Sequence, residues 1–335
     1  MKAKGLGLLS GGLDSSLSAL LLIRQGIYVE GIYFNNGFCI IDYQKKIREK
    51  KVSHPAIDFS EKFKIKINII DIKEEFLSIL KNPRYGYGSA INPCIDCRIL
   101  MLRKAREIME KEKFDFIFTG EVLKQRPMTQ MPRTLKLIEI KSGLEGLIIR
   151  PLSQKLLPLT LPEKKGLVDR ELLMDFEGRE RKRQIKLAKE LGLINYPSPA
   201  GGCCFLTDKN YKNRFFDLLK NKKDIRPIDF YLLNIGRHFR LSKNVKLILG
   251  RDEKENEYLL QNLKEFIVLL PLAPAPFGLL ENTNDENIIN LAIEICLSFC
   301  KLKEEVLVKV YFPDGKEVSV QKFPEKKNFE DLRIK

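Results

Sequence analysis

The sequence lacks tryptophan and has only two histidines, His54 and His238, in 335 residues. Two histidines so far apart do not suggest a histidine metal site, so any metal centre would need other ligands. Cysteine is present seven times. An odd number of cysteines argues against a disulfide framework and favours metal binding or reactive thiols.

Long apolar runs are also missing. The most apolar late stretch, 266–280, contains three prolines and is shorter than the roughly 20 residues that a membrane-spanning helix needs, so we expect core or loop there. The apolar stretch at 1–10 is too short for an export signal. These features predict a cytoplasmic protein without a membrane partner.

Acidic residues are fewer than basic ones. The sequence has 44 Asp and Glu and 59 Lys and Arg, which gives a formal net charge of +15. Such a surface attracts polyanions, nucleic acid first. A lysine-rich proteome gives the same excess, so charge alone leaves both interpretations open.

Strand and helix patterns alternate in the first part of the chain. Short apolar strands are predicted at 5–9, 29–34, 66–70 and 114–119, with a helix over 13–24 after the first of them. This rhythm predicts an α/β fold with a doubly wound parallel sheet.

Three segments are predicted along the chain. We expect an α/β domain over 1–155 and a small basic middle region over 156–231, which includes a helix over 179–191 and the second cysteine segment. Residues 232–335 mix apolar runs at 245–249 and 306–312 with a helix over 286–302, which predicts a C-terminal α+β domain.

A glycine-rich loop joins the first strand to the first helix. Glycines let the backbone approach an anion, hydroxyls can donate to it, and the helix start adds N–H groups. The loop ends in neither the Gly-Lys-Ser/Thr of a Walker loop nor the pattern of a dinucleotide fold. The residues expected to form this phosphate site are Ser10, Gly11, Gly12, Asp14, Ser15 and Ser16.

This loop resembles the SGG-x-DS loop of the PP-loop ATP pyrophosphatases, which cleave ATP to AMP and pyrophosphate while adenylating a substrate. The resemblance implies that the loop holds pyrophosphate and that Asp14 acts catalytically near Mg²⁺. It also implies that adenine lies near Phe34, at the end of the second strand.

Two further segments narrow the resemblance. The run from Thr119 to Gln125 resembles the TGE-x-L-x-Q signature of the tRNA 4-thiouridine synthetases, and 147–152 resembles their LRPL signature. Both are expected where parallel strands end, which is where such sheets bind ligands. By resemblance, Gly120, Glu121 and Gln125 belong to the ATP site.

The cysteine segment Asn92-Pro93-Cys94-Ile95-Asp96-Cys97 resembles the NPD-x-x-C segment of the tRNA 2-thiouridylases. The resemblance makes Cys97 catalytic. Cys94 occupies the acidic position of that pattern, and Asp96 is the nearby acidic candidate. Gly202-Cys203-Cys204-Phe205 resembles the second cysteine segment of the same enzymes. The doubled cysteine leaves the register open between Cys203 and Cys204, and Cys203 is taken as the second catalytic cysteine.

These thiolates suit zinc or an iron–sulfur cluster. In cluster-dependent tRNA thiolases three cysteines hold a [4Fe–4S] cluster, which by resemblance makes Cys94, Cys97 and Cys203 the ligands. A persulfide cysteine pair, a zinc site and buried thiols are the alternatives. The remaining cysteines, Cys39, Cys296 and Cys300, are expected to be core or incidental.

Two regions are predicted to bind RNA. Arg179, Arg181, Lys182 and Arg183 form a basic turn that could pair with phosphates, the alternative being a solvated helix face. The segments at 236–239, 249–256 and 307–311 resemble the NFACT-R RNA-binding domain, the alternative being an accessory domain.

The sequence therefore predicts an ATP-dependent tRNA sulfurtransferase that adenylates a uridine carbonyl oxygen and replaces it with sulfur. Its expected partners are tRNA and a sulfur donor, either sulfide or a persulfide carrier protein. A small-molecule adenylating amidotransferase or sulfur transferase, and a non-catalytic RNA-binding protein with a vestigial PP-loop fold, are the alternatives.

Overall fold

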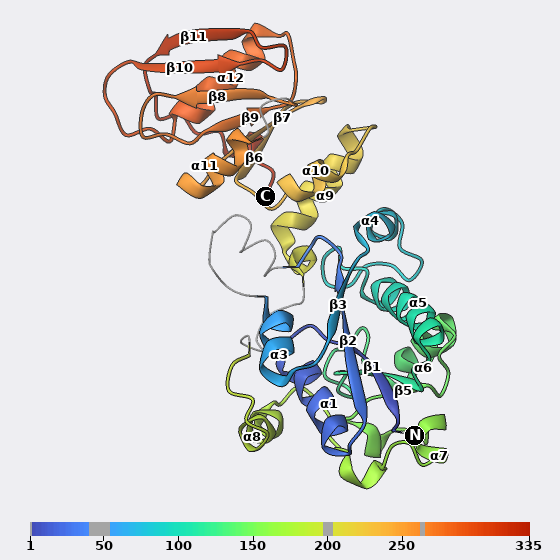
Figure 1. The fold of residues 1–335 in the computed structure, drawn as a ribbon. Helices are drawn as coiled ribbons and strands as arrows, with labels where there is room; N and C mark the ends of the chain where they lie inside the picture. Colours follow the sequence, from blue (N-terminus) through green and yellow to red (C-terminus); the bar gives the residue numbers. More distant parts are fainter. Residues whose placement is uncertain (1, 40–53, 197–203, 262–264) are drawn as a thin grey trace. The chain divides into compact units, whose positions relative to one another are not determined.

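The computed structural model describes residues 2–39, 54–196, 204–261 and 265–335. These residues form two compact units (Figure 1), the first reaching to Cys204 and the second beginning at Phe205. The expected middle region, 156–231, is therefore divided between the two units.

The first unit is built on a five-stranded parallel sheet with the order β3-β2-β1-β4-β5. Its strands are β1 (Lys4–Leu8), β2 (Tyr28–Asn35), β3 (Ile67–Asp71), β4 (Phe116–Thr119) and β5 (Ile148–Ile149). Its helices are α1 (Leu13–Arg24), α3 (Pro55–Phe63), α4 (Lys73–Lys81), α5 (Cys94–Glu112), α6 (Pro132–Ser142), α7 (Leu161–Lys164) and α8 (Lys182–Glu190).

Helices cover both faces of this sheet. Helices α1, α3 and α8 share one apolar core, which includes Leu17, Phe59 and Leu187. Helices α5 and α6 share the other, with Leu102 and Ile138. The predicted doubly wound α/β fold is confirmed. Strand β1 lies between β2 and β4, so the winding reverses beside β1, and in such sheets ligands bind at this point.

The second unit is built on a six-stranded antiparallel sheet with the order β11-β10-β8-β9-β7-β6. Its strands are β6 (Arg237–Ser242), β7 (Val245–Leu249), β8 (Ile267–Pro271), β9 (Gly278–Leu280), β10 (Val306–Tyr311) and β11 (Glu317–Lys322). Its helices are α9 (Lys209–Asn221), α10 (Pro227–Leu232), α11 (Glu253–Leu260) and α12 (Glu286–Leu297). Helix α12 packs on one face of the sheet, and α10 and α11 pack on the other, so the predicted α+β domain is confirmed.

The structure defines the elements of two predicted segments in more detail. The stretch 266–280 contains the buried strands β8 and β9, because Pro271 is the last residue of β8 and the other two prolines lie in the connection. The helix expected over 179–191 begins only at Lys182. Within the residues that the structure describes, no helix has the length and apolar character needed to cross a membrane.

Candidate active site

The phosphate loop lies between β1 and α1 and has little room around it. Gly11 has a φ of +72°, and a Cβ atom there would lie 2.1 Å from the carbonyl carbon of Pro55, at the start of α3. Only glycine combines this backbone conformation with this close approach. The hydroxyl of Ser15 donates to the carbonyl of Gly12 at 3.0 Å and lies 3.2 Å from that of Ser10.

The loop after β4 closes against the phosphate loop. A Cβ atom at Gly120 would lie 2.4 Å from the backbone nitrogen of Ser15. The side-chain amide of Gln125 donates to Asp14 Oδ2 at 3.2 Å. The structure thus brings together the predicted phosphate-site residues with two of the residues expected after β4.

Asp14 is the acidic centre of this site. Burial raises the pKa of its carboxyl group, and the hydrogen bond from Gln125 and the charges of Arg181 and Arg126 oppose this effect. Its Oδ1 atom is buried and has no hydrogen-bond partner among the described residues. A buried carboxylate oxygen without a partner, next to an anion cradle, fits a magnesium ion.

Arg181 belongs to the neighbourhood of Asp14. It is the N-cap residue of α8, a helix that packs in the same core as α1, and it is half-buried. Its Nε atom is buried without a hydrogen-bond partner in the described part of the chain. Sequence reasoning placed Arg181 with the RNA-binding residues and missed its position near the phosphate loop.

The rest of the basic turn is more exposed. Lys182 forms an ion pair with Glu180 at 2.9 Å. Arg183 pairs with Asp175 and lies over the ring of Phe176. Arg179 is exposed and precedes the helix.

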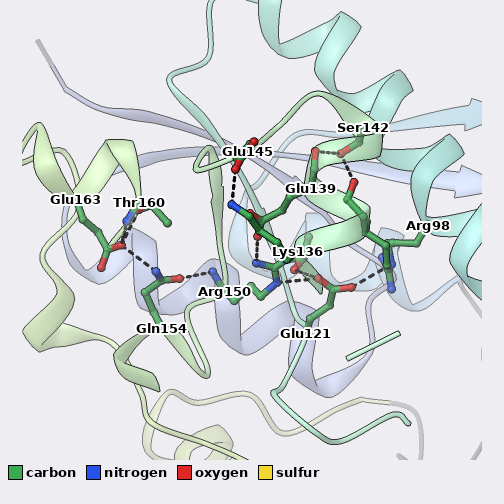
Figure 2. A network of polar contacts seen from close by, with 12 residues as sticks. Arg98, Glu121, Lys136, Glu139, Ser142, Glu145, Arg150, Gln154, Thr160 and Glu163 are labelled. Atoms are coloured by element: carbon green, nitrogen blue, oxygen red, sulfur yellow. Dashed lines mark hydrogen bonds and ion pairs between the residues drawn. The ribbon is translucent and has the colours of Figure 1, made fainter. Parts of the chain in front are cut away.

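Glu121 takes part in a buried network of ion pairs (Figure 2). Its side chain is 2% exposed, and its Oε2 accepts from Arg150 Nε at 3.0 Å and from the Thr119 hydroxyl at 3.0 Å. Arg98 lies 3.3 Å from the other oxygen, and Arg150 also pairs with Glu139. This carboxylate therefore faces arginines of the protein and ties β4 to β5 and α5.

The network keeps both main partners charged. Burial raises the pKa of Glu121, but Arg98 and Arg150 outweigh burial and leave this pKa below its usual value. Burial lowers the pKa of Arg150, but Glu121 and Glu139 outweigh it and leave this pKa raised.

Phe34 is another residue that was expected near ATP. Its side chain lies in the apolar core on the α5 face of the sheet.

The first cysteine pair lies in the first turn of α5. The amide of Asn92 donates to Cys94 Sγ at 3.1 Å. The carboxylate of Asp96 accepts from the backbone nitrogens of Arg84 at 3.2 Å and Tyr85 at 3.0 Å, so it holds the preceding loop.

Cys204 pairs with Cys39 in an isolated antiparallel β-bridge. Sequence reasoning treated Cys39 as incidental, although it follows the end of β2, the strand next to β1. Cys203, predicted as a ligand and as catalytic, lies outside the described residues. Among those that are described, no group of three His, Cys, Asp or Glu is placed to hold a metal ion.

Two family models match the chain. The one described as "Thiamine biosynthesis protein (ThiI)" covers residues 1–155, and the one described as "NFACT protein RNA binding domain" covers residues 236–331. The residues matched by the first model lie in the first unit, which is called the PP-loop domain below for this similarity. Both predicted resemblances, of the PP-loop domain to tRNA thiolases and of the C-terminal region to NFACT-R, are confirmed.

The names of curated relatives describe enzymes that modify tRNA. A tRNA-specific 2-thiouridylase of Karelsulcia muelleri is 26% identical over 257 residues, which are 75% of this chain and 62% of the relative. A tRNA sulfurtransferase of Photorhabdus laumondii is 30% identical over 148 residues, 44% of this chain and 28% of the relative. The chain thus spans less than two thirds of the length of these relatives.

Among solved structures, a 4-thiouridine synthetase–RNA complex with bound ATP aligns with a TM-score of 0.33 and 20% identity. The alignment covers 57% of this chain and 52% of that one.

Proposed function

We propose that the chain is an ATP-dependent tRNA sulfurtransferase. The observation that carries the proposal is the buried Oδ1 atom of Asp14, which has no partner among the described residues and lies beside a tight phosphate loop at the point where the sheet reverses its winding. The names of the curated relatives supply the substrate class.

The phosphate loop would hold the pyrophosphate of ATP while a uridine carbonyl oxygen attacks the α-phosphorus. Backbone N–H groups at the start of α1 and the hydroxyls of Ser10 and Ser15 are the donors for this anion. Asp14 would hold Mg²⁺ through its unpartnered oxygen, and the ion supplies charge neutralisation for the leaving pyrophosphate. Arg181 adds a protein cation on the same side.

Adenylation converts the uridine oxygen into a leaving group. Sulfur held at the cysteine site then attacks the activated carbon, the carbon–oxygen bond breaks, and AMP leaves. Cys97 is the proposed sulfur-handling residue of α5, with Cys203 or Cys204 as its partner and Asp96 as an acidic group one residue away. Sulfide supplies the sulfur at the oxidation level of the thiouridine product. If a persulfide carrier protein supplies it instead, release of the product leaves a disulfide between Cys97 and its partner cysteine, which an external thiol reduces.

The cysteine site also defines the cofactor proposal. Thiolates at Cys94 and Cys97 are suitable ligands for a [4Fe–4S] cluster with Cys203 as the third, and zinc or a persulfide pair are the alternatives. Iron and inorganic sulfide in anaerobically prepared protein support the cluster, and stoichiometric zinc without iron rejects it.

The basic turn is a proposed tRNA contact. Arg179, Lys182 and Arg183 present charge at the start of α8, and phosphate contacts by these residues make binding sensitive to salt. Neutralising Arg179 should reduce the slope of log Kobs against log salt by about 0.7–0.9. An unchanged slope would mean that this turn is a solvated helix face and does not contact tRNA phosphates.

The reaction products test the proposal directly. With unmodified tRNA and ATP, the protein should release pyrophosphate and AMP, and Asp14→Ala should abolish this release. Asp71→Ala is the matched control, because Asp71 lies at the same end of the sheet but on the edge strand β3, exposed and paired with Lys73. ADP as the main product, or full turnover by Asp14→Ala, contradicts the proposed function.

A further inference from the structure

The second unit gathers four arginines from separate elements of its fold. They come from helix α9, from the first residue of β6, from the loop after β7 and from the segment that runs beside β6 near the end of the chain. The members of this arginine cluster are Arg214, Arg237, Arg251 and Arg333.

Hydrogen bonds to a single loop bring two of these side chains together. Arg214 Nη1 donates to the carbonyl oxygen of Leu233 at 2.8 Å, and Arg251 Nη2 donates to that of the next residue, Asn234, at 3.3 Å. Both guanidinium groups therefore lie at the connection between α10 and β6.

A buried carboxylate fixes the remaining geometry. Glu255 is fully buried and accepts from the backbone nitrogens of Gly236 at 3.1 Å and Arg251 at 2.9 Å. It thereby holds the two glycine–arginine segments, 236–237 and 250–251, side by side. Arg237 Nη1 donates to the carbonyl oxygen of Gly250 at 3.2 Å, directly beside Arg251. Glu255 organises the cluster and neutralises only part of its charge.

Two of the four guanidinium groups have carboxylate partners, and two do not. The paired arginines are Arg251, with Glu255, and Arg333, with Glu330. Arg214 and Arg237 make no ion pair with any described residue, and Arg214 Nε is buried with no hydrogen-bond partner among them. The fold thus holds uncompensated positive charge in a partly buried position.

The pKa values of Arg214 and Arg237 reflect this excess of positive charge. Burial and the charge of Arg251 lower the pKa of Arg214 to about 10, although Asp208 opposes them. Burial, Arg333 and Arg251 likewise lower the pKa of Arg237. A bound anion stabilises such a cluster, because its attraction to the guanidinium groups offsets the repulsion between them.

An aromatic ring lies at the edge of the cluster. The guanidinium carbon of Arg237 is 4.8 Å from the ring centroid of Phe299, which is 40% exposed. Arginine planes and half-exposed aromatic rings are the surfaces on which unpaired RNA bases stack. An inorganic anion does not stack on an aromatic ring. The combination of Arg237 with Phe299 therefore favours a nucleotide as the ligand.

We infer that the arginine cluster is a binding site for one nucleotide of an RNA strand. The phosphodiester lies against Arg237, with the charges of Arg251 and Arg333 beside it, and the base stacks at Phe299. The inference rests on the proposed function for its partner, tRNA, and adds the residues by which the second unit holds that partner.

Salt-dependent tRNA binding by the full chain tests the phosphate contacts. Arg237→Gln should weaken binding and lower the slope of log Kobs against log salt by about 0.7–0.9, whereas Arg237→Lys should keep most of the slope. Arg226→Gln is the matched control, because Arg226 also lies over a phenylalanine ring but is paired with carboxylates outside the cluster. Equal affinity and slope for wild type and Arg237→Gln overturn the inference.

The aromatic contact has a different signature. Phe299→Ala should weaken tRNA binding roughly five- to hundredfold without changing the salt slope, because stacking involves no counterion release. Phe323→Ala is the control, since Phe323 is 51% exposed in the same unit. If Phe299→Ala binds like the control, or if inorganic phosphate alone saturates the cluster and leaves tRNA binding unchanged, the site is not a nucleotide site.

Pyrophosphate release measured on the same preparations separates the two proposals. Wild-type protein that releases no pyrophosphate, while the cluster variants still lose tRNA affinity, contradicts the sulfurtransferase and supports the RNA site. Normal release by wild type, with unchanged tRNA binding by every cluster variant, contradicts only the RNA site.

Discussion

The two units use clustered arginines in opposite ways. In the PP-loop domain, Arg150 and Arg98 face Glu121 and Glu139, so charges balance within the protein. In the arginine cluster of the second unit, Arg251 and Arg333 have carboxylate partners, whereas Arg214 and Arg237 form no ion pair with a described residue. A balanced network holds elements together without help, whereas an unbalanced cluster needs a ligand to complete it.

Breaking the balanced network should have the largest effect on stability. Arg150→Met leaves the buried Glu121 carboxylate without its main partner and should lower the free energy of unfolding by about 3–5 kcal/mol, measured by urea denaturation. Lys136→Gln removes an exposed pair with Glu145 and should cost less than about 1 kcal/mol. A loss for Arg150→Met as small as for this control means that the network does not hold the domain together.

Lowering the pH should weaken the same network. The pKa of Glu121 in the fold lies below its ordinary value of 4.5, so the unfolded chain binds more protons between the two values. The stability that Glu121 contributes is therefore complete above the unfolded pKa and is lost as the pH falls through the folded pKa. The difference in unfolding free energy between wild type and Glu121→Gln should shrink below about pH 4.5. A difference independent of pH contradicts this assignment.

The charged carboxylate of Asp14 should lower the stability of the fold, whereas that of Glu121 raises it. The pKa of Asp14 is raised in the fold, so the charged carboxylate opposes folding at pH 7. Asp14→Asn should therefore stabilise the PP-loop domain, by about 0.5–2 kcal/mol, while pyrophosphate release is lost. Thermal unfolding of wild type and variant without nucleotide measures this. A destabilised Asp14→Asn protein would assign Asp14 a structural role.

The smallest stability effect is expected in the arginine cluster. Arg237→Gln removes one of several like charges and no ion pair, so its unfolding free energy should stay within about 0.5 kcal/mol of wild type. Urea denaturation measures this in the absence of RNA. A loss comparable to that of Arg150→Met would show that the cluster is a structural network like the one in the PP-loop domain.

The sequence predicted those features that depend on local pattern. The phosphate loop, the parallel sheet and the apolar strand at 245–249 follow from glycine placement and hydrophobic spacing, and the structure agrees. The direction in which a polar side chain points depends on distant residues. Glu121 follows β4 next to the loop, yet it faces Arg150 because that arginine leaves the neighbouring strand β5.

The arginine cluster could not be derived from sequence spacing for the same reason. Its members are separated by up to 119 positions, from 214 to 333. Three of them meet because β6 pairs with β7 and with the segment at Arg333, and Arg214 joins them through its hydrogen bond to Leu233. The nearness of Cys39 to Cys204 likewise depends on a pairing between segments 165 positions apart.

Mass spectrometry of tRNA nucleosides tests the central claim most directly. Unmodified tRNA incubated with the protein, ATP, Mg²⁺ and sulfide should yield a thiouridine whose mass is higher than that of uridine by the replacement of one oxygen with sulfur. Omission of ATP or the substitution Asp14→Ala should abolish the product. Uridine that stays unmodified with active, folded protein, while ATP is converted to AMP and pyrophosphate on another substrate, would contradict the account.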